Sequence, residues 1–270
     1  MNTPEPLPHL SIKLGKLLTR IRPAPLGAFL KRILCIRRFV FESKEGKFFV
    51  DPASNFGLRL IENGEYEPGT TRQLHQLLKP GGVFIDLGAN EGYYSIIAGR
   101  IVGMKGRVIG IEPQSRLQEV LRKNRSLNEL ENLEFASCAI SDKEETSEIY
   151  LLPDLNTSGS SMAQITRYRN ETESIQTKRL VTLLGELNIE QVDLIKIDIE
   201  GWEWEAVMGS PELFRSGKIK HILLELHNHI LEQRGFDYRE LESLLQDAGY
   251  QRNPDFHEHW ILQEPGSPLT

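Results

Sequence analysis

The chain has 270 residues, of which 39% are hydrophobic and 26% charged, and a formal net charge of −6. A chain of this length and composition buries one sizeable core, which excludes a disordered or fibrous protein. Its longest apolar runs fall far short of the roughly 20 residues that span a bilayer, and the first 35 positions contain no unbroken apolar signal segment. Cys35 and Cys138 alone provide no disulfide framework or cysteine-rich metal site, so we expect a cytoplasmic protein.

Positive charge is concentrated at the N-terminus. Residues 1–40 carry eight Lys or Arg and one Glu, a net charge of +7, so the remaining residues sum to −13. The segment LSIKLGKLLTRI predicts a helix with a basic polar face and an apolar face formed by Leu10, Leu14, Leu17, Leu18 and Ile21. Such a helix either contacts an anionic membrane or an acidic partner, or packs on the protein body with a solvated basic face. The acidic remainder argues against a nucleic-acid partner.

The sequence pattern of residues 1–55 predicts a basic helical segment followed by a β-hairpin. Pro23 and Pro25 interrupt the first helical pattern, and PLGAFLKRIL restarts it. RRFVFES and FFVDP then flank a Lys-Glu-Gly-Lys turn, the pattern of two short paired strands. This section is too small to fold alone, so we expect it to form a cap on the second unit, residues 56–270.

From residue 56 onward, helical patterns alternate with short strands. The expected helices lie at about 70–78, 93–102, 115–127, 202–208 and 237–248, and the expected strands at about 82–87, 107–113, 133–138, 147–153, 192–198 and 219–226. This alternation predicts an α/β fold with a doubly wound, mostly parallel sheet. Two last strands, near 250–252 and 259–263, are too close for a crossover helix and predict an antiparallel hairpin at the sheet edge.

The segment GGVFIDLGANEGYYS, residues 81–95, predicts a central strand and a tight turn. Residues 83–85 are apolar at successive positions, as in a strand that is buried on both faces. Gly88 and Gly92 give the backbone conformational freedom, and a helix that starts near Tyr93 directs its free N–H groups toward the turn. We therefore expect this turn to cradle a cofactor.

Four carboxylates, Asp86, Glu112, Asp198 and Glu225, close or nearly close predicted strands, and ligands of doubly wound sheets bind at that edge. Glu112 lies 26 residues after Asp86 and suits both hydroxyls of a ribose. The turn lacks the G-x-G-x-x-G pattern of a pyrophosphate site, and Asp86 would repel a pyrophosphate but attract an amino group. S-adenosylmethionine, a nucleoside with a cationic amino-acid end, therefore fits better than a nicotinamide dinucleotide.

FIDLGANEGYYS, GIEP, the pair Asn124 and Asn128, and DLIKIDIEGWEWEAVMG followed by ILLELH resemble the FkbM-type methyltransferase family. The resemblance covers residues 56–263. It implies a Rossmann-like class I methyltransferase fold with a seven-stranded sheet, and methyl transfer from S-adenosylmethionine to a hydroxyl of a sugar, polyketide or similar metabolite. Trp202 and Trp204 replace smaller residues of the family pattern, and the first 55 residues lie outside it.

The expected cofactor contacts follow from this resemblance. Asp86 and the turn would hold the methionine end, with Asn90 donating to its carboxylate, while Glu112 takes the ribose. The segment CAISD, residues 138–142, would border the adenine, with Ser141 or Asp142 at its amino group, unless Asp142 is only a turn residue. The predicted cofactor site comprises Asp86, Gly88, Ala89, Asn90, Gly92, Tyr93, Glu112, Pro113, Ala139, Ile140, Ser141, Asp142 and Asp198.

The expected acceptor side lies at the ends of the strands near residues 198 and 226. Transfer to an alcohol needs the oxygen placed close to the methyl carbon, with a base or a metal beside it. His227 is the predicted base, oriented by Glu225 or Asp198. Glu200 and Lys196 complete the predicted catalytic set, because period-two alternation places them on the side of Asp198. A divalent cation held by Asp198, Glu225 and His227 is an alternative.

Structural roles are alternatives for several of these residues. Lys196 also suits neutralisation of a carboxylate, and Glu200 and Glu203 suit stabilisation of the first turn of the following helix. His227 itself would also fit as a loop histidine. Trp202 and Trp204 are expected to be pocket walls or core. The loop NTSGSSM, residues 156–162, is either a lid over the acceptor or an ordinary surface loop.

Taken together, these patterns predict a methyltransferase that acts on oxygen. Its expected acceptor is a small molecule or glycan, with a saccharide hydroxyl first and a polyketide or peptide product second. Two other classes stay open, a nicotinamide-dinucleotide oxidoreductase and a cofactor-binding module without turnover. The oligomeric state is left open.

Overall fold

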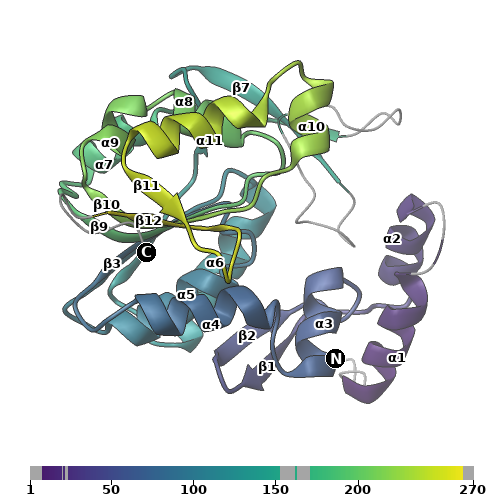
Figure 1. Ribbon diagram of the computed structural model, residues 1–270. Coiled ribbons are helices and arrows are strands. Elements are labelled where there is room, and N and C mark those ends of the chain that lie inside the picture. Colours follow the sequence, from purple (N-terminus) through teal and green to yellow (C-terminus); the bar gives the residue numbers. More distant parts are fainter. Residues whose placement is uncertain (1–7, 20, 22–23, 153–161, 163–170, 264–270) are drawn as a thin grey trace.

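The computed structural model describes residues 8–19, 21, 24–152, 162 and 171–263. Its centre is a seven-stranded sheet in the order β11-β12-β10-β9-β3-β4-β5, covered by helices on both faces (Figure 1). The strands are β3 (Val83–Leu87), β4 (Arg107–Ile111), β5 (Leu133–Ala136), β9 (Val192–Ile197), β10 (Ile219–Leu224), β11 (Tyr250–Arg252) and β12 (His259–Leu262). One face carries α4 (Pro68–Leu77), α5 (Tyr93–Val102) and α6 (Ser115–Leu127), and the other carries α7 (Leu180–Glu186), α8 (Glu203–Met208), α9 (Pro211–Arg215) and α11 (Tyr238–Asp247).

The sheet confirms the predicted Rossmann-like class I methyltransferase fold. Five strands, from β5 to β10 in the sheet order, pair in parallel, whereas β12 pairs antiparallel with both β10 and β11 and forms the expected edge hairpin. The strand order reverses at β3, which lies between β4 and β9. A crevice forms at such a reversal because the connections leave in opposite directions, so the fold places a ligand site outside the carboxyl ends of β3 and β9.

Several elements were missed by the sequence patterns. They are α3 (Asn55–Asn63), β6 (Ala139–Ile140), β8 (Glu171–Lys178), α7, α9 and α10 (Asn228–Gln233). Strand β8 has the polar sequence ETESIQTK and buries only Ile175 and Thr177, which leaves little apolar periodicity to detect. The predicted strand β7 (Thr146–Leu151) pairs antiparallel with β8 in a separate three-stranded sheet and does not join the main one.

The N-terminal hairpin shares its core with the larger unit. Strands β1 (Phe39–Ser43) and β2 (Gly46–Val50) form the predicted antiparallel pair. Phe48 and Val50 are fully buried in the same cluster as Phe84 of β3 and Tyr93 of α5. The boundary drawn at residue 55 therefore separates segments that are packed together.

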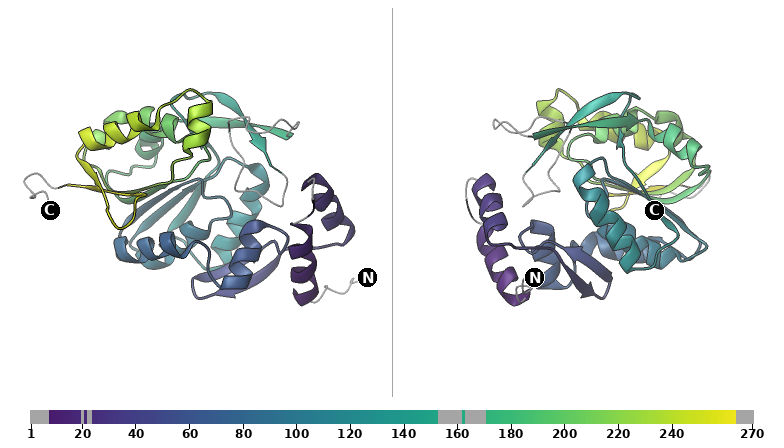
Figure 2. Two further views of the ribbon diagram at one scale, coloured as in Figure 1. Left: turned by 45° about the vertical axis from the view of Figure 1, so that its right-hand side comes forward. Right: turned by 180° about the vertical axis from the view of Figure 1, so that it is seen from behind.

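The two N-terminal helices, α1 (Pro8–Leu18) and α2 (Ala24–Ile33), lie side by side at one edge of the molecule (Figure 2). The sequence pattern placed five apolar residues of α1 and its end on one face, but the structure divides them. Leu14, Leu18 and Ile21 pack inward, whereas Leu10 and Leu17 are 55% and 59% exposed. Within the described residues, no helix has the length and apolar character needed to cross a bilayer.

A buried histidine pair ties β12 to β10. Nε2 of His259, which is 2% exposed, lies 3.1 Å from Nδ1 of His221. Asn253 fixes the tautomers: its Oδ1 accepts from the Asp255 N–H, so its amide group donates to Nδ1 of His259 at 3.0 Å. His259 therefore accepts at Nδ1 and donates from Nε2 to His221, which requires both rings to be neutral. Burial and the neighbouring His221 lower the pKa of His259 to about 4.

Acid should therefore destabilise the folded protein through His259. Its pKa is about 4 in the fold and 6.5 when unperturbed, so the unfolded state binds more protons between these values and the free energy of unfolding falls as pH drops from 6.5 toward 4. Melting temperatures from about pH 7.5 to about pH 4.5 check this. The His259→Gln variant should lose less than the wild type over this range, and the exposed His257→Gln should match the wild type. Parallel curves for His259→Gln and wild type would contradict the assignment.

Candidate functional site

A cavity opens at the carboxyl ends of β3, β4 and β9. It encloses about 920 Å³ of space, including the solvent at its open mouth. Its wall combines the turn after β3 (residues 87–91), the loop after β4 (111–114), the segment 138–140 and the loop after β9 (198–200). Aromatic rings from α3, the α3–α4 connection, α5 and the start of α8 complete the wall, namely Phe56, Tyr66, Tyr93, Tyr94 and Trp202. The cavity thus occupies the crevice that the strand order predicts.

The turn after β3 touches the loop after β9 directly. Gly88 has a φ of +83°, and a Cβ at this position would overlap the backbone carbonyl of Asp198. The N–H of Asp198 in turn donates to the carbonyl of Leu87 at 3.2 Å. On the other side, the N–H groups of Gly88 and Ala89 donate to the carbonyl of Ile111, the last residue of β4. Glycine is needed here because the conformation and the close backbone approach both exclude a side chain.

Glu112 and Asn90 give the cradle polar groups that suit a nucleoside. The carboxylate of Glu112 is 3% exposed, and its two oxygens accept from the N–H groups of Asn90 and Gln114 at 2.9 and 3.0 Å. Each oxygen keeps lone pairs for the hydroxyls of a ribose. Oδ1 of Asn90 is buried and has no hydrogen-bond partner within the described chain. Buried polar atoms are normally satisfied, so this oxygen marks a place for a ligand donor such as an amino group.

Asp86 is not among the residues that line the cavity, and its contact with the cofactor stays a prediction. Its carboxylate is fully buried, with Oδ2 accepting from the Ser95 hydroxyl at 2.6 Å. Burial raises its pKa. Across the strands it is paired in register with Lys196, whose side chain does reach the wall. Asp86 therefore acts on the cavity through Lys196 and the backbone of the turn. Gly92 also lies outside the wall, where it starts α5.

Lys196, which is buried, and Asp198, which is partly exposed, form an ion pair in the cavity wall. Nζ of Lys196 lies 2.7 Å from a carboxylate oxygen of Asp198 and 5.0 Å from the ring centre of Tyr94. Burial lowers the pKa of Lys196, but the carboxylates of Asp198 and Asp86 outweigh it, so the net pKa is raised. The ammonium group is therefore charged, and it offsets the carboxylates beside it.

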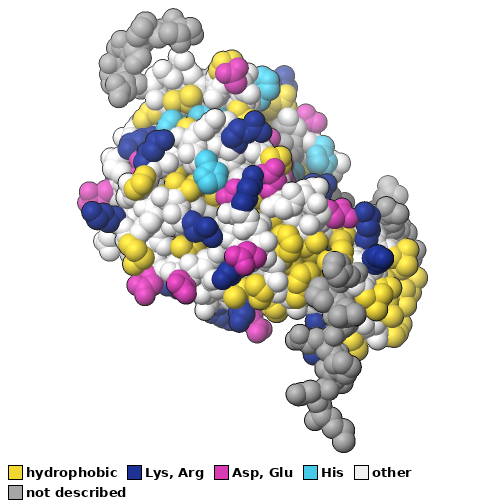
Figure 3. All heavy atoms as spheres, turned by 90° about the horizontal axis from the view of Figure 1, so that it is seen from below, with side chains coloured by type: hydrophobic (Ala, Val, Ile, Leu, Met, Phe, Trp, Pro, Cys, Tyr) yellow, Lys and Arg dark blue, Asp and Glu magenta, His cyan; other side chains and the backbone are white. Residues whose placement is uncertain are grey.

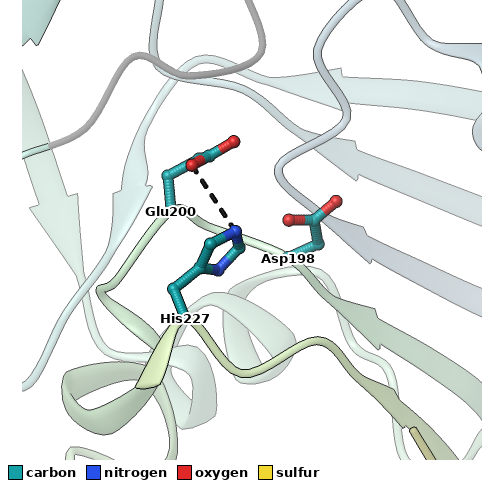
Figure 4. Close-up of side chains that lie close together, drawn as sticks. All are labelled: Asp198, Glu200 and His227. Carbon is teal, nitrogen blue, oxygen red and sulfur yellow. Dashed lines mark ion pairs between the residues drawn. The ribbon is translucent and has the colours of Figure 1, made fainter. Parts of the chain in front are cut away.

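The loop after β9 brings Glu200 next to His227 (Figure 4). Glu200 lines the cavity, and its backbone has a φ of +53°, in the left-handed region. Its carboxylate lies 3.5 Å from Nε2 of His227, and Nδ1 of the same ring lies 3.0 Å from the fully buried Glu203. Burial raises the pKa of Glu200 to about 7. A carboxyl group with this pKa exchanges protons near neutral pH.

The structure changes the role expected of His227. Burial lowers its pKa, but Glu203 and Glu200 outweigh this effect and raise it to about 9, so the ring is protonated at neutral pH and is poorly suited to accept a proton. The ring lies outside the cavity wall. Its orienting partner is Glu203, not the expected Glu225 or Asp198. Glu203, for which the sequence pattern predicted a helix-stabilising role, also accepts from the N–H of Gly201, so this one carboxylate contacts both the loop and the His227 ring.

The predicted metal ligands are not the ones that the fold brings together. Within the described chain, the ligand atoms that lie within 4.8 Å of one another belong to Asp198, Glu200 and His227. Glu225 is outside this group and outside the cavity wall, although burial raises its pKa to about 7. In the structure the carboxylate of Asp198 is paired with Lys196 and that of Glu200 with His227.

Trp202 of the cavity wall contacts Arg234 through its ring and Ser141 through its indole N–H. The Arg234 guanidinium lies 3.7 Å from the ring centre of Trp202 and also bonds the carbonyl of Gly201 and the carboxylate of Glu205. Nε1 of Trp202 donates to the Ser141 hydroxyl at 3.2 Å.

The segment 138–140 reaches the cavity, but the two polar residues that follow it do not. Ser141 accepts from Trp202 and donates to Asp142 at 3.1 Å. Neither residue is among those that line the cavity, and their contact with the adenine stays a prediction. Trp204 stacks on Phe236 at 4.4 Å, also outside the wall, as expected for core. The expected lid, residues 156–162, lies outside the described residues except Met162, which lines the cavity.

Comparison with known proteins decides the family. The model of the methyltransferase FkbM domain matches residues 86–252, which is more than half of the chain. The chain belongs to the FkbM methyltransferase family. The family resemblance implies S-adenosylmethionine as the methyl donor, and the glycine turn, Glu112 and the orphaned Asn90 oxygen of this FkbM domain fit that cofactor.

The curated relatives each match part of this chain. The AMB antimetabolite synthetase AmbE of Pseudomonas aeruginosa is 26% identical over 188 residues, covering 56% of this chain and 9% of that protein. A ribosomal RNA large subunit methyltransferase E of Acinetobacter baumannii is 39% identical over 74 residues, covering 27% of this chain and 33% of that protein. Methyltransferase 1 of Beauveria bassiana is 21% identical over 183 residues, covering 62% of this chain and 71% of that protein. The chain thus spans well under two thirds of the first two relatives.

Among solved structures, the methyltransferase FkbM of Methylobacillus flagellatus KT is similar to this chain. The two are 16% identical with a TM-score of 0.41, and the similarity covers 93% of this chain and 59% of that one.

An ion pair missed by the sequence patterns joins the N-terminal hairpin to the FkbM domain. Arg38 donates to both carboxylate oxygens of Glu91, at 2.6 and 3.0 Å, and Glu91 is 1% exposed in the cavity wall. Asn124 of α6 donates to the carbonyl of Glu91 and accepts from the N–H of Phe49 in β2. The cofactor turn is therefore held by residues that precede the family match. Arg38 stands in an ordinary basic dipeptide, so no local pattern could have identified it.

Replacing Gly88 by alanine should damage cofactor binding more than a matched change at Gly81. Both residues have a φ near +84°, which costs an alanine about 1–2 kcal/mol. Space around Gly81 is open, whereas an alanine at Gly88 meets the backbone of Asp198. We expect Gly88→Ala to lower S-adenosylmethionine affinity at least about tenfold in titration calorimetry, and Gly81→Ala to keep wild-type affinity. Equal affinity in both variants would contradict the cradle.

Breaking the ion pair between Arg38 and Glu91 should destabilise the protein. An Arg38→Met variant leaves a buried carboxylate without its partner, which costs about 3–5 kcal/mol of unfolding free energy. Denaturant titration should show this loss and a smaller one in the double variant Arg38→Met/Glu91→Met. The exposed neighbour provides the control, since Arg37→Met should stay within about 0.5 kcal/mol of wild type. A double variant as unstable as the single one would refute this account.

Proposed function

We propose that the protein methylates a hydroxyl oxygen of a saccharide or glycosylated small molecule, with Glu200 as the general base. The observation that carries this proposal is the position of Glu200, a carboxylate in the wall of the cofactor cavity whose pKa of about 7 suits proton transfer at neutral pH. An alcohol is a weak nucleophile until its proton leaves, so a base beside the donor is the main chemical requirement.

The cofactor supplies an electrophilic methyl group on a sulfonium. In this proposal Glu112 takes the ribose hydroxyls, while the backbone of residues 88–90 and the Asn90 oxygen take the methionine end. The apolar side of the segment 138–140 borders the adenine. The Asp198 carboxylate, held by Lys196, balances the positive charge of the donor.

On the acceptor side, Glu200 accepts the hydroxyl proton at a carboxylate oxygen. His227 is a positioning residue: Glu203 holds its ring, and the ring faces Glu200 and fixes that carboxylate in the wall. Because this chain already supplies two cationic side chains here, the proposed step uses no metal. A chelator should leave turnover unchanged, and loss of turnover that a divalent cation restores would favour the metal alternative.

The wall supports the choice of acceptor. Tyr93, Tyr94 and Trp202 offer flat apolar faces beside carboxylates, which suits a sugar ring with its C–H face and its hydroxyls. A peptide or polyketide-like metabolite is the second candidate, because the same aromatic faces accept an apolar acceptor. The partial match to an antimetabolite synthetase favours this second candidate.

The Glu200→Gln variant tests the base. Amide replaces carboxylate at nearly constant shape, so the turnover number should fall about 10²–10⁴-fold, while S-adenosylmethionine affinity in calorimetry stays near wild type. Turnover is followed by transfer of isotopic label from the cofactor into a pool of glycans and metabolites, with the product identified by mass spectrometry. Glu232→Gln, an exposed carboxylate on α10, is the matched control and should keep wild-type turnover.

The pH profile separates Glu200 from its neighbour Glu225, which has a similar pKa. Wild-type turnover should rise with pH through about 7, because the carboxylate form of Glu200 accepts the proton. This limb should disappear in Glu200→Gln. If the limb disappears in Glu225→Gln instead, the base is Glu225. Cofactor binding without label transfer to any acceptor would support a binding module.

A further inference from the structure

Outside the cavity, the exposed apolar side chains of the molecule gather on the N-terminal helices. Eight large hydrophobic side chains are strongly exposed in the described part of the chain, and six of them belong to α1, α2 or the residue after α2. We call these six the α1–α2 face, which consists of Leu10, Leu17, Leu26, Phe29, Ile33 and Leu34. Figure 3 shows hydrophobic side chains collected at this edge of the molecule. Contiguous apolar surface of this kind marks an interaction site.

The face is not a frayed or unpacked end of the chain. Leu14 and Leu18 of α1, with Leu30 of α2, pack into a small core with Ile36 and Ala53. Lys16 of α1 also pairs with Glu62 of α3 at 2.6 Å. Each helix thus has an inner apolar side that holds it to the body and a second, outer apolar side. The outer side has no structural role within the described residues.

The charge around the α1–α2 face indicates which kind of partner it binds. Residues 8–41 contain eight Lys or Arg and no Asp or Glu. Lys13, Lys16, Arg32 and Arg37 are exposed among the apolar side chains. Short helices that combine exposed Leu, Ile and Phe with Lys and Arg bind at the interface of an anionic membrane, with the apolar side chains in the acyl boundary and the cations at the headgroups.

The rest of the molecule strengthens this choice. The first 40 residues sum to +7 and the remainder to −13, so an anionic surface attracts the N-terminal helices and repels the body. A second copy of the chain would place one basic face against another, which opposes self-association. With 11 and 10 residues, α1 and α2 are also too short to cross a bilayer and suit binding in its surface.

We propose that the α1–α2 face docks the protein on anionic lipid membranes. Docking there places the cavity beside the membrane, because α1 packs on α3 and Phe56 of α3 lines the cavity. The proposal goes beyond the methyl-transfer reaction and does not depend on the acceptor.

Vesicle binding of the full chain tests this proposal. The probes are vesicles of phosphatidylcholine alone and of phosphatidylcholine with about 30% phosphatidylglycerol, because the proposal needs anionic headgroups. We expect cosedimentation with the anionic vesicles, weak binding to the neutral ones, and release at high salt. The triple variant Leu17→Ser/Phe29→Ser/Ile33→Ser should bind at least about tenfold more weakly, and Lys13→Glu/Arg32→Glu should also lose binding.

The control is Met104→Ser, which removes a large hydrophobic side chain that is 68% exposed outside the face. It should bind like wild type, and thermal melting should show that all variants fold. Unchanged binding by the triple variant, or equal binding to neutral vesicles, would overturn the proposal. If anionic vesicles do not bind, and light scattering shows a dimer that the triple variant abolishes, the face joins two copies. If soluble polyglutamate binds in place of vesicles, the partner is an acidic chain.

Discussion

The backbone contact between the turn after β3 and the loop after β9 is the constraint on which the site depends. Gly88 lets the two segments touch, and the N–H of Asp198 donates to the carbonyl of Leu87. This contact fixes the distance between the cofactor cradle on one strand and the carboxylates on the next. A side chain at residue 88 would separate the two halves of the reaction site, because backbone atoms cannot move aside as a flexible side chain can.

Around that contact, three carboxylates that are at least partly buried are each paired with a cation. Glu91 is held by Arg38 of the hairpin, Asp198 by Lys196 of the same strand, and Glu205 by Arg234 after α10. Such pairs give little net stability, because desolvation offsets the attraction, but removal of one partner is costly. Their effect is to fix the loops in one arrangement. Glu200 also has a cationic neighbour, His227, but it lines the cavity and burial raises its pKa to about 7.

The sheet was predictable because its strands and helices carry strong local patterns. Residues 83–85 are apolar without interruption, as a central parallel strand requires, and residues 192–197 are apolar except for Asp193 and Lys196. Strand β8 was missed because its polar sequence gives no such signal. Within the site, strand ends indicated Asp86, Glu112, Asp198 and Glu225 as rim residues, since the carboxyl edge follows from topology alone. Glu112 and Asp198 line the cavity, whereas Asp86 and Glu225 do not.

The partners of the rim residues were harder to predict. The pairing of His227 with Glu203, and of Arg38 with Glu91, joins segments 24 and 53 residues apart. It depends on how loops leave their strands, which no periodic pattern encodes. His227 is an example. It was expected to be a base, but its neighbours Glu203 and Glu200 raise its pKa, so the ring is a cation at neutral pH. The amphipathic pattern of α1 likewise predicted a helix correctly, but it could not show that Leu10 and Leu17 face outward.

The Arg38 contact also changes what counts as the smallest working unit. The family match begins at residue 86, inside β3, whereas Phe56 and Tyr66 in the cavity wall and the arginine that neutralises Glu91 come earlier in the chain. A fragment cut at the family boundary would keep the most recognisable residues and lose their electrostatic and steric support. For expression, grafting or domain exchange, the functional module starts before Arg38.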